Sequence, residues 1–435
     1  FTIIFYYVLR NFGLDRLYSL FYSLSLSAIS NTQAGTPYYD HHAIIFSLIG
    51  LLLTFLSIKN HSRILIFFVP LVFLCAFLIK QTPSIYLAFL VVITVFYDCI
   101  ATKKYSNIIY IFFGFLFSLV IFFTIIKLLN IRFEDFYYQY IKFASSIGTE
   151  RINSDSFIFP INFSRYFIKY KLMHLAYFVM LFVLINNIIQ QKKYYINQNF
   201  IFIISLILVC YILIFHQMLT LNVKYVYFYI PILIAFSHIF ALNSKYIKLL
   251  SSLTIILCLV CTSYYFLKYI DKRKFLVSSQ NFSKNKIYET KIIDNQYNFK
   301  WITNLSLDTQ EEVENLEIIT SFFNQESKKG KNYIIITDYQ FIMTNLKDNK
   351  NIFIGKWFNP GVSHPKLNSQ LFERYKKYLD KKIFDNNVNK IFFVYPSWFK
   401  EINKSYFKEV FSNCLTDEKV ELKGLIESIN IQKCY

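Results

Sequence analysis

Long apolar runs dominate the first 270 residues of the chain. A helix that crosses the hydrocarbon core of a bilayer needs roughly 17–25 predominantly apolar residues. The runs of about this length lie near 14–30, 42–58, 64–80, 84–101, 106–128, 171–190, 199–216, 224–242 and 247–267. Residues 1–9 are apolar as well, and we expect them to be the end of a span that begins before Phe1. The pattern predicts an α-helical polytopic membrane domain over residues 1–270, with nine or ten spans retained.

The pattern of apolar and polar positions changes after residue 270. Short apolar runs typical of buried strands now alternate with amphipathic stretches typical of helices. Strands are predicted at 333–337, 390–396 and 426–432, and helices at 308–328, 367–384 and 399–412. Strands that alternate with helices favour a small three-layer α/β domain, which we expect over residues 271–435.

One amphipathic stretch interrupts the membrane domain. Residues 133–147, inside the long loop 129–170, place Phe133, Phe136 and Tyr140 on one helical stripe. A helix with such an aromatic face is expected to lie along the membrane surface. The alternative is a helix that packs on the domain formed by residues 271–435.

Charge adds an orientation to this arrangement. Residues 1–270 contain twenty Lys or Arg but only seven Asp or Glu, and 55% of the whole chain is apolar, so a soluble domain of this composition would lack a charged surface. Ten basic residues occupy one set of alternate short loops: Arg10, Arg16, Lys59, Arg63, Lys103, Lys104, Lys192, Lys193, Lys245 and Lys248. The other set holds only Lys80 and Lys224. Because basic loops stay in the cytoplasm, the long loop and residues 271–435 are expected to be extracytoplasmic.

The basic balance of the chain therefore reflects topology and contact with the lipid bilayer rather than nucleic acid. Abundant Ile, Asn, Lys, Phe and Tyr with only nine Gly is typical of an AT-rich genome, which favours a bacterial inner-membrane protein. Cys414 and Cys434 lie in the expected external domain, where an oxidising compartment would allow them to pair.

The acidic residues of the membrane region gather on one side. Asp15 and Asp98 fall on the expected cytoplasmic side, whereas the other five are external: Asp40, Glu134, Asp135, Glu150 and Asp155. Charged side chains are rare in membrane domains, so this accumulation indicates a polar functional site at the outer face.

Asp40 is the most informative of these acids. It precedes a predicted span and is followed by His41 and His42, so the three side chains offer oxygen and imidazole ligands for a divalent metal ion. Neighbouring residues cannot all point at one ion, and two of the three would bind it. The alternative is that Asp40 caps the following helix, which requires no metal.

The segment GTPYYDHHA at 35–43 resembles the second acidic motif of the GT-C superfamily of polytopic glycosyltransferases, and the resemblance covers roughly residues 1–270. It implies that Asp40 holds a divalent ion, Mg or Mn, or orients the phosphate of a polyprenyl-phosphate sugar donor. His41 or His42 would assist, and Tyr38 and Tyr39 are further candidates. The family's other acidic residue, a base or metal ligand in its first external loop, would precede Phe1.

Other polar residues on the expected outer face are candidates for the same site. Glu150 is a candidate catalytic acid, and its neighbour Arg151 offers a guanidinium for phosphate, although a solvated loop pair is the alternative. His216 and Gln217 form a polar spot at the end of a predicted span. The candidate cations for the donor phosphate are Arg151, Arg165, Lys169 and Lys224. Snorkelling to the interface explains Lys224 equally well.

These residues and the resemblance predict an enzyme that transfers a sugar from a polyprenyl-phosphate carrier to a lipid, glycan or protein acceptor on the outer membrane face. A transporter or flippase of lipid-linked sugars is one rival, and it predicts charged residues or broken helices in mid-membrane. The predicted spans contain isolated prolines, Pro70 and Pro231, but almost no charge. A non-catalytic scaffold that displays its external domain is the other rival.

Overall fold

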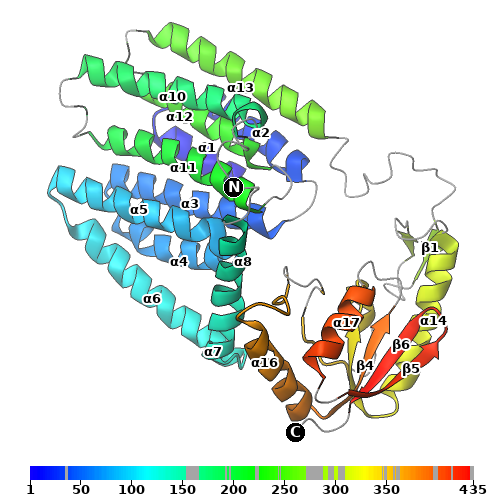
Figure 1. The fold of residues 1–435 in the computed structure, drawn as a ribbon. Coiled ribbons are helices and arrows are strands. Elements are labelled where there is room, and N and C mark those ends of the chain that lie inside the picture. Colours follow the sequence, from blue (N-terminus) through cyan, green and yellow to red (C-terminus); the bar gives the residue numbers. More distant parts are fainter. Residues whose placement is uncertain are drawn as a thin grey trace. The chain divides into compact units, whose positions relative to one another are not determined.

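The protein is described by a computed structural model. The described residues exclude 35–37, 153–165, 192–193, 195–196, 221–224, 243, 245, 271–287, 292–297, 302–308, 345, 347–349, 356–357, 359–362, 395–399, 413–414 and 432–435. The chain divides into two compact units. One is helical and comprises Phe1–Lys142 and Gly148–Val277, and the other comprises Phe143–Ile147 and Ser278–Tyr435. Figure 1 shows the helices of the first and the small sheet of the second.

Apolar helices make up the first unit, as the sequence predicts. They are α1 (Thr2–Asn11), α2 (Arg16–Ala34), α3 (Tyr39–Asn60), α4 (Arg63–Ile79), α5 (Gln81–Thr102), α6 (Ser106–Leu128), α10 (Lys171–Gln190), α11 (Gln198–Thr220), the 3₁₀ turn η4 (Val226–Tyr229) with α12 (Ile230–Ala241), and α13 (Ile247–Tyr269). Among the described residues, six helices are long and apolar enough to cross a membrane: α3, α5, α6, α10, α11 and α13. The runs predicted at 64–80 and 224–242 form the shorter apolar helices α4 and η4–α12. The protein is therefore a helical membrane protein.

Burial differs strongly between these spans. In α3, 72% of the apolar window is buried inside the protein, whereas in α6 only 17% is buried. α6 instead exposes a row of phenylalanines that includes Phe112, Phe113 and Phe115. Such a surface suits hydrocarbon better than water, because apolar patches of this kind are rare on soluble proteins. α3 is thus a central helix of the unit, and α6 is a peripheral one.

The aromatic stretch of the long loop is helical, as its pattern predicts. It consists of α7 (Phe133–Phe136), the π-helix η1 (Tyr137–Lys142) and α8 (Phe143–Ile152). The rings of Phe136 and Tyr140 stack at 5.1 Å between centroids, which agrees with the predicted aromatic stripe. Its location at the membrane surface stays a prediction.

The second unit contains a four-stranded mixed sheet in the order β3 (Asn332–Ile336), β4 (Val388–Val394), β6 (Ile426–Ile431) and β5 (Leu415–Leu422). β3 and β4 are parallel, with Ile334 opposite Ile391, and the other pairs are antiparallel. A separate hairpin pairs β1 (Tyr288–Thr290) with β2 (Phe299–Trp301).

Helices cover both faces of this sheet. Ile334 and Ile336 pack with the apolar sides of α16 (Phe372–Asp385) and α17 (Lys400–Val410). The alternate residues, Tyr333 and Ile335, pack with α14 (Thr309–Ser327) and α15 (Gln340–Thr344). Side chains of a strand alternate between the two faces, so the two apolar clusters confirm the predicted three-layer α/β domain. The sequence prediction missed β5 and the β1–β2 hairpin.

Candidate functional site

Asp40 lies in the first turn of α3, where its side chain is buried and only 5% of the residue is exposed. The helix begins at Tyr39 with Tyr38 in the N-cap position, so the interpretation of Asp40 as the helix cap is wrong. A carboxylate in the first turn is still favoured by the helix dipole. A buried charge in this position nevertheless needs partners, because its desolvation is costly.

Lys80 supplies the first partner. It is the single residue between α4 and α5, and its backbone is extended there (φ −160°, ψ 134°). This break turns the side chain toward the start of α3, where Nζ lies 2.5 Å from Asp40 Oδ1. The Lys80 side chain is 28% exposed and that of Asp40 only 7%. The ammonium group therefore lies at the edge of the site and the carboxylate inside it.

His216 supplies the second partner. It comes from the last turns of α11 and is fully buried, with Nε2 3.0 Å from Asp40 Oδ1. Its Nδ1 has no hydrogen-bond partner among the described residues. The hydroxyl of Tyr225 lies 3.5 Å from the same Nε2, and the Tyr225 amide donates to Gln217 Oε1 at 3.2 Å. The Asp40 cluster, which we define as Asp40, Lys80, His216 and Tyr225, thus joins the ends of five helical elements: α3, α4, α5, α11 and η4.

The residues next to Asp40 differ in whether they pack inside the protein or are exposed on its surface. His41 is buried against Phe228 and Tyr225, with ring centroids 5.0 Å and 5.8 Å apart, and its Nε2 has no partner among the described residues. Tyr38 stacks on Tyr225 at 6.4 Å. Tyr39 is exposed, and so is His42, whose Nδ1 lies 2.9 Å from the Tyr38 carbonyl oxygen.

No metal centre is evident around Asp40 in the part of the chain that the structure describes. No group of three or more His, Cys, Asp or Glu side chains there could hold a metal ion. The Asp40 oxygen that would bind a cation already faces the ammonium of Lys80, which an incoming divalent ion would have to displace. The arrangement therefore does not fit a metal at this oxygen, and the predicted ion remains a sequence-based expectation.

The predicted phosphate-binding cations lie largely outside the described part of the chain. Arg165 and Lys224 fall in undescribed segments, and Arg151 belongs to α8 but its side chain is not described. Glu150, in the same helix, is exposed. The roles expected for these residues stay predictions, as does a pairing of Cys414 with Cys434, which are also undescribed.

Sequence reasoning missed both Lys80 and Tyr225 as site residues. The loop pattern identified Lys80 only as one of two basic residues on the side expected to be external. A lysine retained in a region that disfavours basic residues, directly between two apolar runs, was the available signal.

No family model, curated protein or solved structure matches the chain.

A second buried acid, Asp98, lies at the other end of α5. Its Oδ1 accepts a hydrogen bond from Gln198 Nε2 at 3.0 Å, and its Oδ2 one from Asn107 Nδ2 at 3.3 Å. These amides connect the ends of α5, α6 and α11. The two buried aspartates thus have different partners. Asp40, close to Lys80 at the start of α5, contacts an ammonium and an imidazole, whereas Asp98 in the last turns of α5 accepts from two amides.

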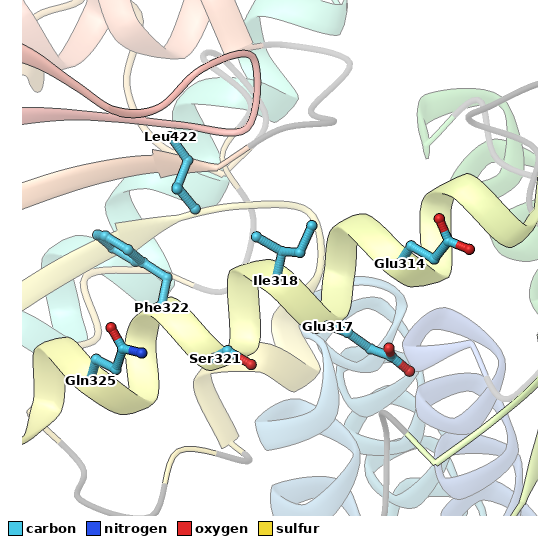
Figure 2. A pocket seen from close by; sticks show the side chains of 7 residues that line it. All are labelled: Glu314, Glu317, Ile318, Ser321, Phe322, Gln325 and Leu422. Atoms are coloured by element: carbon cyan, nitrogen blue, oxygen red, sulfur yellow. The ribbon is translucent and has the colours of Figure 1, made fainter.

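The second unit offers a shallow groove of about 540 Å³ along α14. Figure 2 shows Ile318 and Phe322 pointing toward Leu422 of β5, with Glu317 directed away from it. The remaining lining side chains are Glu314, Ser321 and Gln325. The groove combines apolar and acidic groups and lies in a different unit from the Asp40 cluster.

Proposed function

We propose that this chain transfers a sugar from a polyprenyl-phosphate donor to a lipid, glycan or protein acceptor, at the membrane face where the Asp40 cluster lies. The observation that supports the proposal is a buried carboxylate that holds an ammonium group at the edge of a site formed by the ends of apolar helices. The proposal also draws on the resemblance of the segment around Asp40 to the GT-C motif.

Transfer from such a donor breaks the bond between the sugar C1 and a phosphate oxygen. The electron pair stays on the phosphate, while the acceptor oxygen forms a new bond to C1 and releases its proton to a base. The leaving phosphate gains charge in the transition state, and a fixed cation stabilises that charge without a proton transfer. Lys80 is suited to this role because its ammonium is partly exposed and yet anchored by Asp40.

In this scheme Asp40 positions the cation and does not bind the phosphate itself. His216 contributes a second hydrogen bond to Asp40 Oδ1 and limits the orientations that the carboxylate can adopt. The cluster lies in terminal turns and at a helix junction. A transporter is expected to place its polar residues near the bilayer midplane, so this location favours chemistry at the surface over transport.

The test uses the full chain in membrane vesicles that contain a mixture of polyprenyl-phosphate sugars and acceptors. Release of free polyprenyl phosphate is measured by mass spectrometry of extracted lipids. Asp40→Asn and Lys80→Met are each expected to lower the release rate by about a hundredfold, the usual effect of losing one transition-state donor.

Asp98→Asn is the matched control, because it also neutralises a buried acid. Asp98 lies at the end of α5 opposite Lys80 and has no contact with the cluster among the described residues. This variant is expected to keep a near wild-type rate. Release by Asp40→Asn and Lys80→Met at the wild-type rate, with all variants present in equal amounts, would refute the proposed transfer.

A further inference from the structure

Tyr140 contacts the chain on both sides of Lys80. Its hydroxyl donates to the carbonyl oxygen of Phe77, three residues before Lys80. Its own carbonyl oxygen accepts a hydrogen bond from Nε2 of Gln81, the residue directly after Lys80. One aromatic residue from a loop far along the chain thus holds the last turn of α4 and the first residue of α5 together.

The segment that carries Tyr140 is itself anchored to the spans. The ring of Phe77 meets that of Tyr140 edge to face at 5.6 Å, and Phe136 stacks on Tyr140 at 5.1 Å. Phe136 in turn contacts Phe122 of α6 at 5.2 Å. Tyr140 is therefore part of an aromatic column that extends to α6, and it belongs to a π-helical turn, a feature frequent at functional sites.

Lys80 depends on the geometry of this junction. Its amide donates to Ala76 O at 3.0 Å, and its carbonyl accepts from Ser84 Oγ at 2.9 Å, so its backbone is tied to both helices. The side chain, in contrast, is partly exposed, and a lysine side chain loses considerable rotamer entropy when it is fixed. The relative placement of α4 and α5 therefore decides whether the ammonium meets Asp40.

We infer that Tyr140 and Gln81 are positioning residues, which set the α4–α5 junction so that Lys80 is presented to Asp40. The inference rests on the proposed function only for the role of Lys80 in stabilising the leaving phosphate. Without the two hydrogen bonds of Tyr140, the junction gains freedom and the ammonium spends less time at the carboxylate.

The test measures the position of Lys80 directly, through its reactivity in the full chain. Vesicles are treated with a membrane-permeable amine-acylating ester, and acylation of Lys80 is quantified by mass spectrometry relative to the exposed Lys268. Tyr140→Phe and Gln81→Met each remove one hydrogen bond. Each is expected to raise the acylation rate of Lys80 about two- to tenfold, which is the population change that one net hydrogen bond supports. Each should also lower the rate of polyprenyl-phosphate release by a similar factor, with little change in KM.

Tyr137→Phe is the control, since it removes a hydroxyl from the same π-helical turn and leaves both contacts of Tyr140 intact. It is expected to leave the acylation of Lys80 unchanged. Unchanged acylation in both Tyr140→Phe and Gln81→Met would overturn the inference, even if release fell. Faster acylation in a protein whose wild-type form releases no polyprenyl phosphate would support the positioning role and refute the proposed transfer. If Tyr140→Phe does not accumulate, the acylation rate of Lys80 in the milder variant Gln81→Met decides whether the inference holds.

Discussion

Lys80 and Asp40 form an ion pair across 40 residues of sequence, although both belong to a region in which charged residues are scarce. The pair is asymmetric, because the carboxylate is buried and the ammonium is partly exposed. An ammonium in this position can neutralise the buried acid and still reach a ligand outside the protein. The contact therefore affects both the stability of the helical unit and its proposed chemistry.

A double-mutant cycle should separate the stability of this pair from its chemistry. Asp40→Asn removes the anion that pairs with the Lys80 ammonium, and Lys80→Met removes the cation from the buried Asp40 carboxylate, which keeps its contact with His216. Each substitution is expected to cost about 2–3 kcal/mol. The double variant is expected to be less destabilised than the sum of the two. Thermal unfolding of the purified chain in detergent measures the difference, and additive effects would contradict a direct ion pair.

The combination of Lys80→Met with Asp98→Asn provides the reference for that cycle. Asp98 has amide partners at the opposite end of α5, so the two substitutions share no contact. Their effects on the unfolding free energy are expected to add within about 0.5 kcal/mol.

The charge asymmetry of the short loops predicts the orientation of the protein. A reporter that is active only in the cytoplasm should be active when fused at Lys103 and inactive when fused after Lys300. A reporter that is active only outside should show the reverse. Cytoplasmic activity of the fusion after Lys300 would mean that the orientation is inverted, and with it the face assigned to the Asp40 cluster.

Gly114 determines how closely α4 and α6 approach. A Cβ atom at this position would lie 2.0 Å from the Phe67 carbonyl oxygen, which is backbone and cannot move aside without the helix. Gly114→Ala is therefore expected to destabilise the helical unit by about 1–3 kcal/mol. The thermal midpoint in detergent tests this, with Gly148→Ala as control because its added Cβ meets open space. Equal midpoints for the two variants would contradict the close approach.

The helical spans could be predicted because their signal is local. Each run of apolar residues identifies its own helix, and the bounds of α6 (Ser106–Leu128) and α10 (Lys171–Gln190) agree with the runs at 106–128 and 171–190. β5 escaped prediction because its sequence, LTDEKVEL, is rich in charged residues and reads as a loop. It forms a strand through pairing with β6, and such pairing is not visible in the strand's own sequence.

The site was only partly predictable for a related reason. Asp40 was identifiable from its neighbours in sequence, and His216 was noticeable as a polar residue at the end of a span. That the two share a hydrogen bond results from the packing of α3 against α11, which no local pattern encodes. Lys80 required knowledge that α4 and α5 join through one extended residue. Sequence thus identified candidates, and tertiary packing assembled the cluster.

His364 makes the second unit sensitive to acid. Its ring packs among Tyr406, Phe407 and Tyr375, and its Nε2 has no partner in the described part of the chain. Burial lowers the pKa of His364 from 6.5 to about 4. The unfolded chain therefore binds a proton near pH 6.5 that the folded domain takes up only near pH 4. The free energy of unfolding should fall as the pH drops through this window, by about 3 kcal/mol in total.

Hydrogen exchange of the full chain can measure this loss in peptides from α17 (Lys400–Val410), after correction for the intrinsic pH dependence of exchange. The opening free energy should decline between pH 6.5 and 4 in the wild type and much less in His364→Phe, which keeps a ring in the cluster but removes the titrating group. The exposed His42, replaced in the control His42→Phe, should leave the decline unchanged. Glu421 contributes only at the acid end of this window: burial raises its pKa, but hydrogen bonds from Lys390, Ser428 and Lys419 outweigh this and lower it to about 2. Its stabilisation begins to be lost near pH 4.5, equally in the wild type and in His364→Phe. An equal decline in His364→Phe and wild type would show that another group carries the acid sensitivity.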